Sequence, residues 1–188
     1  MSDLTAMARY SREAGQVHPR ALRTPEYAVR MRLRLSARLD RSLLPAPPDH
    51  LARPVEAADK PALAALMLDA YRGTVDDAGE GPEEAAAEVA RLFDGAYGTF
   101  DFAASELIKR DGVVVSATLV TEYQGGAMVA FSMTAPAWQQ RGLARAGLVR
   151  TMSRLRAAGR DRVDLAVTET NIAARRLYES LEFVPVAC

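Results

Sequence analysis

The sequence of 188 residues has few of the side chains that bind metals or form covalent cross-links. It contains two histidines and a single cysteine, Cys188. One cysteine cannot form an intrachain disulfide, which is typical of a reducing compartment, so we expect a cytoplasmic protein. So small a supply of cysteine and histidine also argues against a zinc site, and we expect no metal cofactor.

Long apolar runs and net charge are also missing. No stretch is long enough to cross a bilayer, and residues 1–16 contain no apolar run of the signal-peptide type. The chain has 24 basic and 24 acidic residues, so its formal net charge is zero. We therefore expect no nucleic-acid or membrane partner, although arginines gather within residues 1–50 and acidic residues within 69–94.

The composition itself is that of an ordinary globular domain, with 49% hydrophobic and 26% charged residues. From Val29 to Leu39 apolar and polar residues alternate, which predicts a strand with one wet face, although Thr24–Glu26 would also serve as a helix start. Prolines between residues 45 and 48 indicate a linker. We therefore divide the chain into an N-terminal extension, residues 1–50, and a domain, residues 51–188.

Within this domain several strands come first, and then helices and strands alternate. The patterns predict strands at 51–56, 103–109, 113–121, 127–134, 163–167 and 183–187, with turns at Asp111–Gly112 and Gly125–Gly126. They predict helices after an N-cap at Asp59, from Pro82 onward, at 142–158 and at 172–181. This order favours a mixed α/β sheet with helices packed on its faces.

The segment Gln139–Ala144 joins the end of a predicted strand to the start of a helix. A helix N-terminus presents unpaired N–H groups and the positive end of a dipole, which together favour phosphate binding. Gly142 and Ala144 are small enough to let a ligand approach the backbone, and Arg141 and Arg145 add positive charge. The segment is consistent with a pyrophosphate cradle, and an ordinary arginine-rich helix start is the alternative.

A second motif lies near the C-terminus, where Asn171 is placed to cap a helix. With the first segment, it resembles the GNAT superfamily of acyl-CoA-dependent N-acyltransferases from Leu51 onward. The family pattern V-x-P-x-x-[QR]-x-x-G-x-[GA] is met by Thr134, Pro136, Gln139, Gly142 and Ala144, and N-x-x-A-x-x-L-Y-x-x-x-G-F by Asn171, Ala174, Leu177, Tyr178 and Phe183. The chain departs from these patterns at Thr134, in place of valine, and at Glu182, in place of glycine.

This resemblance implies an N-acetyltransferase that moves an acetyl group from acetyl-CoA to a primary amine by direct attack in a ternary complex. It implies a mostly antiparallel sheet that splays between the fourth and fifth family strands. Acetyl-CoA would be bound by Met133, Thr134, Gln139, Gln140, Arg141, Gly142, Leu143, Ala144, Arg145, Asn171 and Ala174. Tyr178 would protonate the leaving thiolate, since its usual pKa of about 10 keeps it protonated at neutral pH. A structural core tyrosine is the alternative.

Neither motif identifies the general base or the acceptor. Glu122 and Glu169 are candidates for the base, each with a solvated surface role as the alternative, and we favour Glu122. Tyr71, Asp76 and Asp77 lie where the resemblance implies an acceptor-binding loop, and the acids would attract a cationic amine. The acceptor would be a small-molecule amine or a peptide or protein amine. A catalytically silent module that binds acyl-CoA is the alternative function.

The end of the chain raises a question of topology. GNAT sheets usually end with a hairpin whose last strand inserts beside the fifth strand, but this chain has room for one strand after its last helix. A gap would leave backbone groups unpaired, so Val29–Ala37 is a candidate to pair with an edge of the sheet, in its own chain or in a homodimer. The alternative that we favour from the sequence is an extra edge strand beside residues 51–56.

Overall fold

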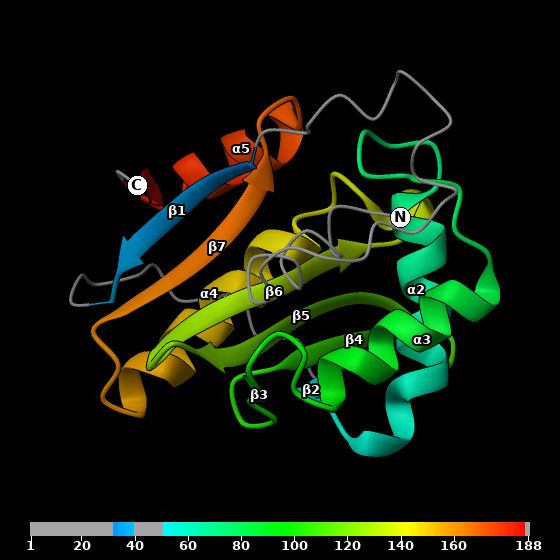
Figure 1. The fold of residues 1–188 in the computed structure, drawn as a ribbon, viewed down its shortest axis with the longest axis horizontal. Coiled ribbons are helices and arrows are strands. Elements are labelled where there is room, and N and C mark those ends of the chain that lie inside the picture. The colour runs from blue at the N-terminus through cyan, green and yellow to red at the C-terminus, as the bar shows by residue number, and fades with distance from the viewer. Residues whose placement is uncertain (1–31, 40–50, 187–188) are drawn as a thin grey trace, which may run out of the picture.

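The computed structural model describes residues 32–39 and 51–186, which form a mixed α/β fold around one eight-stranded sheet (Figure 1). The predicted linker and Cys188 lie outside these residues. The strands are β1 (Arg32–Arg38), β2 (Ala52–Pro54), β3 (Thr99–Phe100), β4 (Glu106–Arg110), β5 (Val113–Tyr123), β6 (Gly126–Thr134), β7 (Arg162–Thr168) and β8 (Val184–Pro185). The helices are α2 (Lys60–Tyr71), α3 (Pro82–Phe93), α4 (Leu143–Ala157) and α5 (Ile172–Glu179), with short 3-10 turns at Ala57–Asp59 and Pro136–Trp138.

The sheet has the order β2-β4-β5-β6-β7-β1-β8, and β3 pairs separately with β5. Neighbouring strands run antiparallel, except that β6 and β7 run parallel. One apolar cluster packs α2 and α3 on one face of the sheet, and a second packs α4 and α5 on the other. This arrangement confirms the predicted mixed, mostly antiparallel sheet with helices on both faces. No helix in the described ranges could cross a membrane.

Local signals in the sequence account for most element boundaries. The β4–β5 turn has positive φ at Asp111 and Gly112, as predicted for a two-residue hairpin loop. The next turn lies one residue earlier than predicted, because Gln124 and Gly125 have positive φ and Gly126 already belongs to β6. β4 begins later than predicted, since Asp101 accepts the Ala104 N–H in a turn that precedes it.

Asp59 has a different role from the predicted helix cap. It stands at the N-cap position of α2, but its carboxylate makes no capping hydrogen bond to that helix. It accepts the Glu56 N–H at 2.9 Å and two hydrogen bonds from the Arg53 guanidinium at 2.8 and 2.6 Å. The adjacent guanidinium holds the pKa of Asp59 below its usual value. The side chain therefore ties β2 to the start of α2.

A β-bulge interrupts β6 in the middle of the sheet. Leu119 of β5 faces Phe131, whereas the next residue of β5, Val120, faces Val129, so Ala130 is an extra residue on β6. The parallel ladder to β7 ends at the same place, with Val129 opposite Leu165 as its last pair. Both strands continue beyond this point and separate (Figure 1). Bulges bend a strand and increase its twist, which accounts for the separation.

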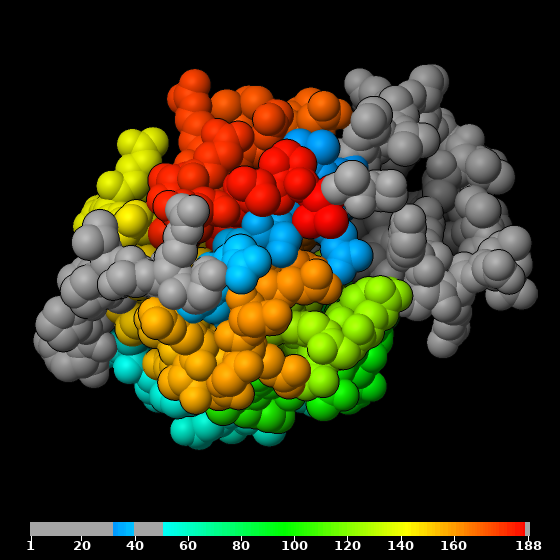
Figure 2. Space-filling model, turned by 90° about the vertical axis from the view of Figure 1, so that its left-hand side faces the viewer, coloured from blue at the N-terminus to red at the C-terminus, as the bar shows by residue number. Residues whose placement is uncertain are grey.

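The N-terminal strand β1 lies inside the sheet of its own chain. It pairs with β7 along its whole length and, at Leu35 and Ser36, with β8 on its other side. Figure 2 shows β1 in blue, flanked by the orange of β7 and the red of the C-terminal segment. The expectation of an edge strand beside residues 51–56 was therefore wrong. Backbone groups of β7 that would have no partner next to a gap are satisfied by β1.

Helix α4 is fixed to the sheet by a buried ion cluster. Glu106 of β4 is 1% exposed and accepts hydrogen bonds from Arg150 at 2.6 to 3.0 Å, with Arg154 at 3.0 Å. A buried carboxylate needs such partners to offset its desolvation. Gly147 faces the same place, where an added Cβ would lie 2.7 Å from the Thr118 hydroxyl. Close packing and charge thus hold α4, and with it the loop that precedes α4.

We expect Leu35→Ala to lower the free energy of unfolding by about 2–5 kcal/mol, because this side chain is 3% exposed within the second apolar cluster. Denaturant unfolding monitored by circular dichroism measures the change. Ser36→Ala, a half-buried neighbour on the other face of β1, is the control and should change stability little. A loss under about 1 kcal/mol for Leu35→Ala would contradict an internal position for β1.

Candidate active site

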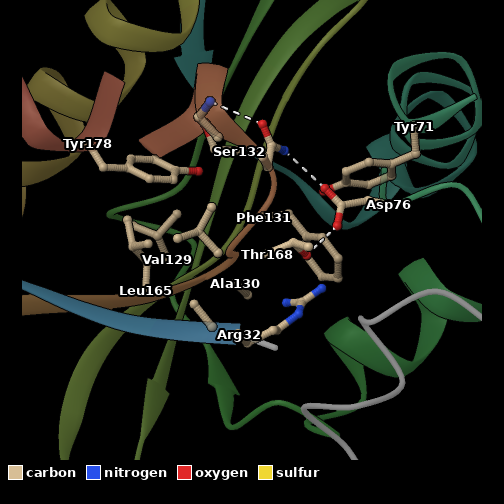
Figure 3. A pocket seen from close by; sticks show the side chains of 14 residues that line it. Arg32, Tyr71, Asp76, Val129, Ala130, Phe131, Ser132, Leu165, Thr168 and Tyr178 are labelled. Carbon is tan, nitrogen blue, oxygen red and sulfur yellow. Dashed lines mark hydrogen bonds between the residues drawn. The ribbon is translucent and has the colours of Figure 1, made fainter. Parts of the chain in front are cut away.

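A pocket opens where β6 and β7 separate. It encloses about 530 Å³ of empty space with its open mouth included. The strands contribute residues 129–132 and 165–168. Figure 3 shows Tyr178 on one side of the pocket, with Tyr71 and Asp76 on the opposite side. The remaining lining residues are Arg32 of β1 and two residues near the start of α5, Asn171 and Ala174.

The backbone of β6 presents one edge to this pocket. The Met133 C=O accepts a hydrogen bond from the Ser116 hydroxyl, and the Ala135 N–H donates to the Val115 C=O, so these two residues face β5. Backbone groups alternate in direction along a strand. The groups that face away from β5 are therefore those of Ser132 and Thr134, and Ser132 lines the pocket.

Tyr178 projects from α5 into the pocket and is 8% exposed. Burial raises the pKa of its phenol to about 12, and the negative charge of Asp76 acts in the same direction. A hydrogen bond with Ser132 and the positive charge of Arg32 lower the pKa by less. The phenol is therefore protonated at neutral pH and can donate a proton.

Asp76 links the loop between α2 and α3 to the start of α5. Its carboxylate accepts hydrogen bonds from the Thr168 hydroxyl at 2.6 Å and from the Asn171 amide at 3.1 Å (Figure 3). Asn171 also caps α5, since its side-chain oxygen accepts the Ala174 N–H at 3.1 Å. Both ends of the Asn171 amide are thus occupied by protein groups, and the two sides of the pocket are joined.

Tyr71 stands at the C-terminal end of α2, next to this loop. Burial raises the pKa of its phenol, with smaller contributions from Asp76 and Tyr178. The pocket thus holds two tyrosines from opposite sides, both protonated at neutral pH. The loop itself is held by Asp77, which accepts the N–H groups of Gly73 at 2.6 Å and Gly79 at 2.8 Å.

The segment before α4 forms an exposed turn of backbone donors. Gln140 and Gly142 have positive φ, and Gly142 is the N-cap residue of α4. Within the described part of the chain, the backbone N–H groups of residues 140–145 donate to no protein acceptor. The Arg141 guanidinium lies 4.8 Å from the centre of the Trp138 ring. Exposed N–H groups at a helix start, next to an arginine, suit an anionic ligand.

Comparison with known proteins identifies the family. The model of the acetyltransferase (GNAT) family matches residues 63–183, more than half of the chain. The chain belongs to this family. A comparison with curated protein sequences found no match.

Solved structures with the same fold include proteins of three bacteria. A protein of Novosphingobium aromaticivorans assigned to the GNAT family is 26% identical, with a TM-score of 0.55 over 83% of this chain and 61% of that chain. The GCN5-related N-acetyltransferase of Sphaerobacter thermophilus is 21% identical, with a TM-score of 0.61 over 82% and 48%. yncA of Salmonella typhimurium, determined with acetyl-CoA, is 22% identical, with a TM-score of 0.51 over 69% and 76%. The chain thus spans less than two thirds of the first two structures.

The structure brings together some of the residues predicted for a GNAT site and separates others. Tyr178, Asn171, Ala174, Tyr71 and Asp76 line one pocket. The turn at 139–145 lies beyond the C-terminal end of β6, the strand whose backbone edge borders that pocket.

Other predicted residues lie outside the pocket lining. Glu122 is on the β5 segment next to the β5–β6 turn and forms a 2.5 Å ion pair with Arg160. Glu169 is exposed, and its backbone C=O accepts a hydrogen bond from Arg175. Asp77 holds its own loop, and the Met133 backbone is turned to β5. None of these four lines the pocket.

The structure adds pocket residues that the motifs did not indicate. Ser132 lines the pocket together with Tyr178, Thr168 hydrogen-bonds Asp76, and Arg32 enters from β1. Ser132 stands within the predicted strand 127–134, and Thr168 directly follows the predicted strand 163–167, so both could have been found from the ends of those strands. Arg32 carried no local signal, because its position depends on the pairing of β1 with β7.

We expect the stability of the protein to fall as the pH rises from about 10 to about 12. The folded protein keeps the Tyr178 proton to a pKa of about 12, whereas the unfolded chain loses it near 10, so the unfolded state binds fewer protons in this window. Tyr178→Phe should make this fall shallower. Urea unfolding at several pH values measures it, with Tyr123→Phe, at the hairpin end of β5, as the control. An equally steep fall in Tyr178→Phe would contradict the raised pKa.

Proposed function

We propose that this chain transfers an acetyl group from acetyl-CoA to a primary amine, by direct attack within the pocket between β6 and β7. The observation that carries the proposal is the buried, protonated Tyr178, which faces Asp76 across the pocket where the sheet opens. We take the end of the β6–β7 ladder as the splay that the family resemblance implies. Membership of the acetyltransferase family supports the reaction class.

The residues present fit acetyl-CoA at both ends of the molecule. The exposed N–H groups of residues 140–145, with Arg141 beside them, would bind the pyrophosphate. The outward backbone edge of β6 at Ser132 and Thr134, instead of Met133, would hydrogen-bond the pantetheine arm. Asn171 would position α5 at the other side of this arm through its cap. When bound, acetyl-CoA supplies the thioester whose carbonyl carbon is attacked.

Two side chains would handle the protons of the transfer. Asp76 would bind the ammonium of the acceptor and take its proton, because it is the carboxylate that lines the pocket, whereas Glu122 lies elsewhere. Each carboxylate oxygen of Asp76 accepts one protein hydrogen bond and has a second lone pair for the amine. The nitrogen forms a bond to the carbonyl carbon, the C–S bond breaks, and Tyr178 gives its proton to the departing sulfur.

We expect Tyr178→Phe to lower kcat for acetyl transfer about a hundredfold or more, because the variant cannot protonate the thiolate. Thiol release from acetyl-CoA, measured against a panel of primary amines, gives the rates. Tyr123→Phe removes a hydroxyl outside the pocket and should keep the wild-type rate.

Two results would count against the proposal. If Tyr178→Phe keeps the rate of the wild type with the best acceptor, Tyr178 is not the proton donor. If acetyl-CoA raises the melting temperature but no amine releases thiol, the chain is instead a silent acyl-CoA-binding module.

A pair of glycines at the two ends of α4 tests the phosphate cradle. Gly142 and Gly159 have nearly equal positive φ, 78° and 80°, and an added Cβ would meet no atom within 4 Å at either site. Alanine at either position should therefore lower the free energy of unfolding by a similar amount, about 1–2 kcal/mol. We expect only Gly142→Ala to weaken acetyl-CoA binding, about tenfold, as measured by calorimetry. Equal affinities for the two variants would place the pyrophosphate elsewhere.

A further inference from the structure

Among the described residues, the lining of the pocket carries two formal charges of opposite sign on different elements. Asp76 belongs to the loop between α2 and α3, and Arg32 is the first residue of β1. The other described residues that line the pocket have side chains that are apolar or neutral at pH 7. Figure 3 shows the Arg32 guanidinium directed into the space below Asp76 and Tyr71. A ligand in this pocket therefore meets an anion and a cation.

Arg32 is held in place by the pairing of β1. Its backbone lies opposite Thr168, the β7 residue whose hydroxyl donates to Asp76. Arg34 lies on the same face of β1, two residues after Arg32. It does not line the pocket, but forms a 2.7 Å ion pair with the buried Asp164. The strand thus presents one arginine to a structural carboxylate and the next to the pocket.

The positive charge of Arg32 affects the pKa of a residue on each side of the pocket. It lowers the pKa of Tyr71 and of Tyr178, against the larger effect of their burial. These two tyrosines belong to α2 and α5, on opposite sides of the pocket that Arg32 also lines. A guanidinium binds a carboxylate through two parallel hydrogen bonds. A neutral amide in place of the carboxylate would form a weaker contact with the guanidinium.

We propose that the acceptor is a small amine that also carries a carboxylate, of the free amino acid class, with its carboxylate on Arg32 and its amine at Asp76. The inference rests on the proposed function and narrows it. Simple amines lack a group for Arg32, and the amine at the end of a protein chain has no carboxylate beside it. The matched charges therefore select against both of these classes.

The test compares acceptors in pairs that differ only in charge: glycine with glycinamide, β-alanine with its amide, and γ-aminobutyrate with its amide. The kcat/KM ratio within each pair is measured for the wild type, Arg32→Gln and Arg32→Lys. We expect at least one pair to favour the carboxylate by tenfold or more in the wild type. Arg32→Gln should lower that ratio about tenfold, whereas Arg32→Lys should keep part of it. The two acceptors of a pair also differ in the intrinsic reactivity of their amines. This difference is the same for every variant, so it cancels when the kcat/KM ratio of one variant is compared with that of another.

Arg38→Gln is the matched control, because Arg38 lies on the same strand, is exposed and does not line the pocket. It should keep the wild-type ratio. A ratio near one in the wild type, or one that Arg32→Gln leaves unchanged, would overturn the inference. Melting temperatures show whether each variant is folded, and Arg32→Lys retains a cation if Arg32→Gln does not fold.

Calorimetric titration of the same compounds, with coenzyme A present, separates the two proposals. If no compound releases thiol but the carboxylate members bind and lose affinity in Arg32→Gln, the proposed transfer fails and the ligand class stands. If transfer occurs and the carboxylate members bind no more tightly than their amides, the ligand class fails and the transfer stands.

Discussion

One extra residue in the middle of the sheet determines where this protein can bind a ligand. Ala130 bulges β6 against β5, and the parallel ladder to β7 ends at the neighbouring pair, Val129 and Leu165. Beyond that pair the backbone edge of β6 turns towards a pocket instead of a strand. Since an uninterrupted ladder would use those same backbone groups, the bulge converts sheet hydrogen bonds into potential ligand contacts. Helix α5, the loop between α2 and α3, and the first residue of β1 each contribute side chains to the lining of this pocket.

Two polar contacts keep the opening from closing or collapsing. Asp76 reaches from a loop to Thr168 and Asn171, so the α2 side of the pocket is tied to the start of α5. On the opposite face, Glu106 holds α4 through Arg150, and with it the turn of exposed backbone donors. Both carboxylates are satisfied by protein partners, which offsets the cost of removing them from water. The site is thus prepared before any ligand arrives.

The sequence predicted those features that depend on nearby residues. Two-residue turns, the helix that starts at Pro82 and the cap at Asn171 follow from local backbone preferences. All were found, with the second turn one residue earlier than predicted. Features that depend on distant partners were missed. No glycine or proline marks the bulge at Ala130. Glu122 was favoured as the base because it stands at the end of a strand, but the sequence does not say which end of the sheet carries the pocket. Arg32 becomes a pocket residue only through a pairing between segments far apart in the chain.

That pairing also constrains the order of events during synthesis. Arg34 on β1 forms its ion pair with Asp164, 130 positions later, and β8 completes the other side of β1 near the C-terminus. During synthesis, β1 must therefore wait for both of its neighbours, which are made much later. Closing so long a loop is slow, and the apolar face of a strand without partners can associate with other chains in the meantime. Efficient production of this protein therefore depends on how well the nascent β1 segment is shielded until β7 and β8 have been made.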